Sequence, residues 1–242
     1  MKTRVDKLLA ANGWGSRRDI KRLMRTYVLT VNGHVCVDPA TYINLDTDVL
    51  HLRGEPLLLR TTVYLMLNKP AGVVSSTLDP LHKTVLDLLG PPWASMDLHP
   101  VGRLDYDTEG LLLLTNDGQL THRLTSPKAG IPKRYHAQLR DPVDDCLFEH
   151  YVEQLHQGVT LKDGYTCLPA QIERISGDQD VVLTICEGKY HQVKKMFRVL
   201  ENKVIQLTRL SMGPISLDSS LAPGEVRELS KKEIDTLREI IG

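Results

Sequence analysis

Three acidic residues and an arginine lie directly before a run of four leucines. Asp105, Asp107 and Glu109 follow Arg103, and the leucines occupy positions 111–114. A short apolar run between turn residues predicts a strand that is buried on both faces. Side chains at the end of such a rigid strand are held in place, so a carboxylate there is a candidate for catalysis. We select Asp105 as the candidate catalytic residue.

These acidic residues have two other interpretations. Their alternation resembles the first half of a calcium-binding loop, but Asn116 holds the twelfth position, where such a loop needs a bidentate glutamate. Alternatively, Asp107 and Glu109 stabilise a turn and pair with Arg103. The chain has no phosphate-binding loop, dinucleotide-binding or serine-hydrolase motif. Its histidines lack metal-binding spacing, so we expect no metal.

The composition indicates a globular protein without a strong overall charge. The 242 residues include 30 lysines and arginines and 30 aspartates and glutamates, and 41% of them are hydrophobic. The four cysteines are widely spaced and form no C-x-x-C pair, which is typical of reduced thiols. No apolar segment has the length of a signal core or a membrane span. We therefore expect a cytoplasmic protein that does not contact a membrane.

Positive charge is concentrated in the first part of the chain. Residues 1–26 contain eight basic and only two acidic residues. Ser16 and Asp19 have the spacing of a capping box, which predicts that a helix begins here. Five basic residues on this helix face a single acid, which favours the binding of a polyanion over a merely solvated charged face. The candidate RNA-binding residues on the helix are Arg17, Arg18, Lys21, Arg22 and Arg25.

The remaining pattern predicts an α+β protein with two domains. Asn32-Gly33 between two β-rich runs predicts a hairpin, which completes a small helix-helix-hairpin domain over residues 1–60. The second domain, residues 61–242, is expected to hold strands at 63–67, 73–77, 111–114, 133–139, 171–175, 181–186 and 204–210. Its helices are expected at 118–124, 142–155 and 190–200. Many strands at hairpin spacing indicate a largely antiparallel mixed sheet with flanking helices and an active-site cleft, rather than a βαβ fold.

The second domain carries five motifs in the order seen in RNA pseudouridine synthases. These motifs are Met66–Gly72, Gly102–Asp105, Lys133–Tyr135, Glu187–Met196 and Leu221–Glu225. The first domain resembles the RNA-binding domain named for small-subunit ribosomal protein four, through Arg4–Leu9, Ser16–Arg18 and Val31–Gly33. Nearly the whole chain thus closely resembles the small-subunit rRNA pseudouridine synthase A group.

This resemblance implies an enzyme that isomerises uridine in RNA to pseudouridine without a cofactor. It makes Asp105 the essential carboxylate, whose ionised form a neighbouring cation favours. Lys194 is that cation, where many relatives carry arginine; the alternative is a lysine on a solvated helix face. Tyr135 is the residue that stacks on the target base; the alternative is a tyrosine half-buried in a strand. Arg103 helps to extrude the nucleotide, unless it forms a structural pair with Asp107.

The resemblance also implies a substrate, which is uridine 516 of 16S rRNA, either in free rRNA or in a small-subunit assembly intermediate. We expect a monomer. Four further basic residues are expected to contact RNA phosphates, namely Lys189, His191, Lys195 and Arg198. Two alternatives stay open, a synthase that modifies a 23S rRNA hairpin and a non-catalytic RNA-binding assembly factor. The presence of Asp105, Tyr135 and Lys194 together argues against the non-catalytic assembly factor, because a protein that only binds RNA does not need these three residues.

Overall fold

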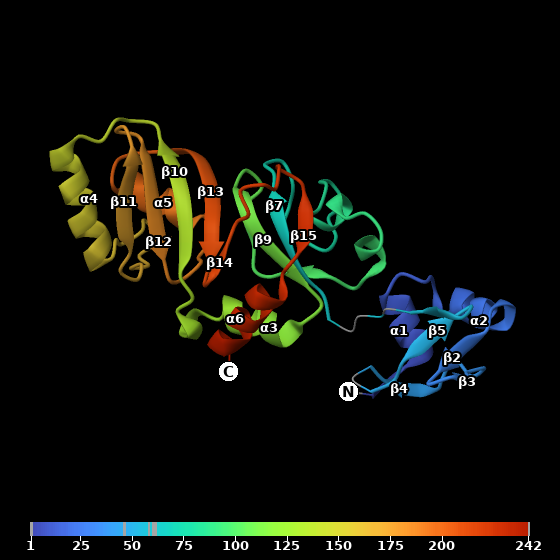
Figure 1. Ribbon diagram of the computed structural model, residues 1–242. Helices are drawn as coiled ribbons and strands as arrows, with labels where there is room; N and C mark the ends of the chain where they lie inside the picture. The colour runs from blue at the N-terminus through green and yellow to red at the C-terminus, as the bar shows by residue number, and fades with distance from the viewer. Residues whose placement is uncertain (1, 46, 58, 60–61, 242) are drawn as a thin grey trace. The chain divides into compact units, whose positions relative to one another are not determined.

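The computed structural model describes residues 2–45, 47–57, 59 and 62–241, and its chain divides into two units (Figure 1). The first unit contains the residues up to Val63 together with Leu89–Leu98. The second unit contains Tyr64–Leu88 and the residues from His99 onward. None of the helices in these described ranges is long and apolar enough to cross a membrane.

The first unit combines helices with small antiparallel sheets. Its elements are β1 (Lys2–Arg4), α1 (Val5–Ala11), α2 (Arg17–Thr26), β2 (Leu29–Val31), β3 (His34–Val35), β4 (Tyr42–Asn44), β5 (Leu50–Leu52), β6 (Glu55–Pro56) and a 3-10 turn at Trp93–Ser95. The expected capping box of Ser16 and Asp19 begins α2. Asn32 and Gly33 have φ angles of 52° and 80° and connect β2 to β3, so the predicted hairpin is present. The strand orders are β1-β4 and β3-β2-β5-β6.

The second unit is built on one large mixed sheet with flanking helices. Its strands are β7 (Tyr64–Lys69), β8 (His99–Pro100), β9 (Glu109–Thr115), β10 (Lys133–Leu139), β11 (Gln171–Ser176), β12 (Asp180–Ile185), β13 (Val204–Met212), β14 (Ile215–Ser216) and β15 (Val226–Glu228). Its helices are α3 (Gly118–Thr125), α4 (Asp145–Gln157), α5 (Gln192–Val199) and α6 (Lys231–Ile241), with 3-10 turns at Leu86–Leu88 and Pro127–Ala129. The main strand order is β11-β12-β10-β13-β9-β7-β15. Among the strand pairs of the described residues only β9 and β13 run parallel, which confirms the predicted α+β class.

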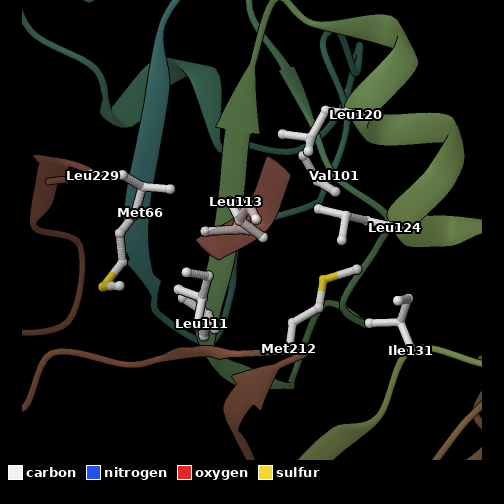
Figure 2. Packing of buried hydrophobic residues seen from close by; sticks show 11 residues of the cluster. Met66, Val101, Leu111, Leu113, Leu120, Leu124, Ile131, Met212 and Leu229 are labelled. Atoms are coloured by element: carbon white, nitrogen blue, oxygen red, sulfur yellow. The ribbon is translucent and has the colours of Figure 1, made fainter. Parts of the chain in front are cut away.

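Strand β9 is buried on both faces, as the leucine run predicts. The four leucines at 111–114 are each at most 2% exposed. Leu111 and Leu113 contribute to a core cluster that also contains Val101 before β9 and Leu120 and Leu124 of α3 (Figure 2). Burying one such leucine side chain contributes about 1.5–3 kcal/mol. The strand therefore gives a rigid base to the residues that precede it.

Gly110 allows β9 to approach β13 closely. It has a φ of 97°, and a Cβ at this position would lie 2.4 Å from the carbonyl oxygen of Arg209. The two strands pair only at Thr208 with Glu109 and at Arg209 with Gly110, and then diverge. Because only glycine has no Cβ, this residue sets the point where the two halves of the sheet meet.

Three local predictions differ from the structure. The β-branched run at 73–77 forms a single parallel bridge between Val74 and Thr84 instead of a strand. Helix α4 begins at Asp145, three residues later than expected, because the Asp144 side chain accepts from the amide of Leu147 and caps the helix there. Helix α5 begins after His191, whose φ of 54° is left-handed and incompatible with a helix.

Candidate active site

The segment that carries Asp105 runs from β8 to β9, and hydrogen bonds fasten its backbone on both sides of that residue. The buried hydroxyl of Ser75 donates to the carbonyl of Leu104 (2.9 Å) and accepts from its amide (3.0 Å). On the other side, the amide of Gly72 donates to the carbonyl of Tyr106 (2.8 Å). The backbone position of Asp105 is therefore fixed by residues about 30 positions earlier in the chain.

Lys69 is a fully buried cation that binds the same segment from β7. Its exposure is 0%, and Nζ donates to the carbonyls of Thr108 (2.8 Å), Pro70 (3.0 Å) and Tyr106 (3.4 Å). Burial lowers the pKa of Lys69 to about 8, even though the negative charges of the three nearby acids oppose this shift. The lysine thus connects the start of β9 to the end of β7.

The carboxylate of Asp105 faces two basic side chains from the start of α5. Nζ of Lys194 donates to Oδ2 of Asp105 at 3.3 Å, and Nε2 of His191 lies 3.6 Å from Oδ1. The side chain of Lys194 is only 14% exposed, so it does not lie on a solvated helix face. The structure thus places the predicted cation beside the predicted carboxylate, although 89 positions separate them.

Lys194 also binds Asp107, which decides against one of the alternatives that the sequence left open. Nζ donates to Oδ1 of Asp107, and no ion pair joins Arg103 to Asp107 among the described residues. Burial alone would raise the pKa of Asp107, but the hydrogen bond and charge of Lys194 outweigh it and hold this pKa below its usual value. Glu109 instead accepts from Nε2 of Gln206 on β13 (2.9 Å), which is a structural contact.

A buried network holds the loop before α5. The carboxylate of Glu187 is 4% exposed and accepts from Tyr165 Oη (2.5 Å), the amide of Leu168 (2.8 Å) and Nε2 of Gln192 (2.6 Å). Oε1 of Gln192 in turn accepts from the amide of Lys189 (2.8 Å). The hydrogen bond to Glu187 raises the pKa of Tyr165 to about 12. The network thus fixes both ends of the loop that presents His191 and leads into Lys194.

Two connected hollows meet at Asp105. The inner cavity, of about 60 Å³, is lined by Asp105, Tyr135 of β10, and the apolar side chains of Ile185, Val193 and Leu207. The outer hollow, of about 570 Å³, extends from Asp105 over Ser75 and Tyr106 to Tyr190. Tyr135 is 7% exposed. Of the residues predicted as catalytic, Asp105 and Tyr135 thus line one cavity, and Lys194 contacts the carboxylate of Asp105.

The predicted RNA-contacting residues have different surroundings. Arg103 and Lys189 are exposed and line both hollows. Lys195 donates to Asp163 (3.0 Å), and Arg198 is an exposed residue of α5 that does not line the hollows at Asp105. The five basic residues of α2 are all exposed on the first unit, and they are Arg17, Arg18, Lys21, Arg22 and Arg25.

Several residues at or beside the candidate site were not singled out from the sequence. Lys69, Glu187 and Gln192 lie within the recognised motifs, but their burial is visible only in the fold. Tyr190 is 74% exposed and stacks on His191, with ring centres 3.8 Å apart. An exposed aromatic beside a loop of basic residues was the available signal for it. Across the residues that the structure describes, no three His, Cys, Asp or Glu side chains gather as a metal site requires.

Known proteins share this sequence and fold. A model of the RNA pseudouridylate synthase family matches residues 63–198. An uncharacterized RNA pseudouridine synthase of Bacillus subtilis is 45% identical over 239 residues, which cover 98% of each chain. Ribosomal small subunit pseudouridine synthase A of Escherichia coli K12 is 44% identical, covering 96% of this chain and 98% of the relative. A crystal structure of a pseudouridylate synthase has 38% identity and a TM-score of 0.67, covering 97% and 99% of the two chains.

Proposed function

The chain belongs to the RNA pseudouridylate synthase family and is an isomerase that acts on RNA, and we propose that it converts a uridine of 16S rRNA, uridine 516, with Asp105 as the catalytic carboxylate. Membership of this family confirms the resemblance that the five sequence motifs indicate. The observation that carries the proposal is the Asp105 carboxylate beside Lys194 and His191, at the wall of a cavity that Tyr135 also lines.

The chemistry requires one bond to break and another to form at the same carbon. The bond between C1′ and N1 breaks, the uracil turns, and C5 bonds to C1′. N1 gains a proton and C5 loses one, so the reaction is a net isomerisation. The carboxylate of Asp105 can stabilise the electron-poor sugar or attack it or the base, and Nζ of Lys194 lies 3.3 Å from its Oδ2.

The cavity suits a base that must be held and still rotate. Tyr135 supplies an aromatic face, and stacking tolerates rotation of the base in its own plane. The neighbouring walls are apolar, with Val193 buried at 4% exposure and Leu207 also at 4%. The target uridine must leave its helical stack to enter, and exposed Arg103 at the rim is placed to help extrude it.

The proposed partner is 16S rRNA or a small-subunit assembly intermediate, bound by a monomer. Two relatives support the small subunit, since the proteins of Escherichia coli and Pasteurella multocida are both named ribosomal small subunit pseudouridine synthase A. Residues 1–60 form the proposed RNA-binding domain, whose basic helix α2 tethers the enzyme and raises its effective concentration at the target. Lys189, His191, Lys195 and Arg198 are proposed to contact phosphates, and Lys195 must exchange Asp163 for one.

Mapping pseudouridine in rRNA tests the target. The protein is incubated with 16S and 23S transcripts, and carbodiimide-dependent stops of reverse transcriptase locate the product. We expect one new stop in 16S rRNA, at uridine 516. A modified 23S hairpin with unmodified 16S rRNA would refute the target. If neither transcript nor an assembly intermediate is modified, the protein is a non-catalytic binding factor.

Substitution of the carboxylate tests its role. Asp105→Asn should abolish isomerisation and retain RNA binding, because it removes the charge beside Lys194 and keeps the shape. Glu109→Gln is the matched control, since Glu109 contacts Gln206 and does not line the cavity. It should keep wild-type turnover. Undiminished turnover by Asp105→Asn would show that the catalytic assignment is wrong.

A further inference from the structure

A second cavity adjoins the inner cavity, and cations make up most of the charged residues that line it. It has a volume of about 190 Å³ and shares Arg103, Tyr135 and Lys189 with the inner cavity. We call it the basic cavity and define it by Arg103, Lys133, Cys186, Glu187, Lys189 and Arg209. Four of these six side chains are basic, and one is acidic.

Strand geometry brings two of these cations to the same face as Tyr135. Lys133 and Tyr135 are two positions apart on β10, and side chains two apart on a strand share a face. Arg209 of β13 pairs directly with Tyr135, beside a β-bulge in the register of the two strands. Paired residues on neighbouring strands also share a face. The basic cavity is therefore part of the sheet that builds the active site.

Both cations are buried without an acidic partner. Arg209 is 2% exposed; its Nε donates to the carbonyl of Leu111 (2.8 Å), while its Nη2 has no hydrogen-bond partner among the described residues. Lys133 is 9% exposed, and its Nζ donates to the carbonyl of Ile131 (2.9 Å). Within the described part of the chain, no carboxylate forms an ion pair with either side chain. Buried charges in proteins are normally paired, because an unpaired charge is strongly unfavourable away from water.

The one carboxylate that lines the basic cavity is already engaged. Glu187 accepts hydrogen bonds from Tyr165, from the amide of Leu168 and from Gln192. Burial lowers the pKa of Lys133, and the positive charge of Arg209 lowers it further. Because these two buried cations repel each other, their proximity does not stabilise the fold. Their arrangement is explained if an anion occupies the space between them.

We propose that the basic cavity binds one phosphate group of the RNA strand next to the target uridine, with Arg209 and Lys133 as its ligands. A guanidinium offers two parallel donors to phosphate oxygens, and an ammonium adds a point charge, so the pair suits a phosphate. The shared residues Arg103 and Lys189 place this phosphate beside the base in the inner cavity. The inference rests on the proposed function, because it assigns a subsite to the same RNA.

Such a subsite explains how a strand is recognised rather than a free nucleoside. Binding energy from a phosphate outside the reacting base can be spent on orienting C1′ toward Asp105. The expected consequence is that uridine without flanking phosphates is not isomerised.

Inorganic phosphate provides a test that does not depend on RNA or on turnover. Cys186 lines the basic cavity, whereas Cys146 is exposed on α4 and serves as an internal control. Phosphate should slow alkylation of Cys186 by iodoacetamide several-fold at constant ionic strength, with no effect on Cys146. Lys133→Met should remove this protection, and Lys162→Met, which changes an exposed lysine outside the cavity, should retain it. Equal alkylation of Cys186 with and without phosphate would overturn the subsite.

A set of RNA fragments with single neutral methylphosphonates identifies which phosphate is bound. For the wild type, one position beside the target uridine should weaken binding about tenfold. For Lys133→Met, which retains the apolar stem, the same position should have less than a twofold effect. If the variant is as sensitive as the wild type at every position, the assignment is wrong. A wild-type protein that shows phosphate protection but modifies no 16S rRNA would refute the proposed function and keep the anion site.

Discussion

Lys69 carries a positive charge although the residue is 0% exposed. Replacing this lysine should therefore change how the unfolding free energy depends on pH. The pKa of Lys69 falls from an ordinary 10.5 to about 8 because burial disfavours the charged form. Since a tenfold change in proton affinity corresponds to about 1.4 kcal/mol, the charged lysine costs the folded state about 3 kcal/mol below pH 8. Between pH 8 and 10.5 the unfolded chain binds more protons than the folded chain. Stability therefore rises with pH in this window.

The variant Lys69→Met has no charge to titrate. The difference between the unfolding free energies of the wild type and Lys69→Met should thus change by about 3 kcal/mol in favour of the wild type between pH 8 and 10.5. Urea denaturation at several pH values measures it. Lys162→Met is the control, since this exposed ammonium stays in water in both states and its difference should stay flat. A flat difference for Lys69→Met would refute the inference that burial disfavours the charge.

Three further predictions concern stability and RNA binding. Gly110→Ala places a Cβ 2.4 Å from a backbone oxygen at a φ of 97°, so it should cost about 3 kcal/mol or more in urea denaturation, and a loss below about 1 kcal/mol would contradict the close contact. Hydrogen bonds with Arg227 lower the pKa of Glu233 to about 2. Glu233→Gln should therefore reduce the unfolding free energy by about 3 kcal/mol at pH 7, and by progressively less as the pH falls from 4.5 toward 2. A loss of stability that does not depend on pH would show that the carboxylate charge is not responsible. Replacing exposed Arg18 and Lys21 of α2 by glutamine should leave turnover at saturating RNA unchanged and reduce the slope of log affinity against log salt by about 1.5, whereas an unchanged slope would remove α2 from the RNA contact.

Local signals predicted the parts of the fold that depend on neighbours in the chain. The leucine run gives a doubly buried strand because an uninterrupted apolar segment has no solvent-facing side. The Asn32-Gly33 turn was predictable because both positions need positive φ angles. Asp105 could be selected because it precedes this strand, and the resemblance supplied Lys194 and Tyr135. The structure then adds their distances, which no local pattern contains.

The buried cations could not be predicted from residue type. Lysine and arginine are usually exposed, so a sequence gives no sign that Lys69, Lys133 and Arg209 are buried. For two of them an acceptor also lies far away in the chain, since Lys69 binds the carbonyl of Thr108, 39 positions later, and Arg209 binds that of Leu111, 98 positions earlier. One of the interpretations left open by the sequence paired Asp107 with Arg103, and only the tertiary position of Lys194 shows why Asp107 binds Lys194 instead. Such contacts form only when separate strands and helices pack together, so the sequence of a single element does not reveal them.

The position of β15 at the edge beside β7 has a consequence for synthesis of the chain. β7 pairs with β15 on one side, and Val226 follows Lys69 by 157 positions. At roughly 5–20 residues per second, a ribosome needs about 8–30 s to add these residues. Throughout this time β7 lacks its final neighbour, and its Leu65 and Leu67 lie on an open strand edge of the kind that associates with other chains. The nascent second unit therefore passes through an interval of aggregation risk that ends only when the last strand is released.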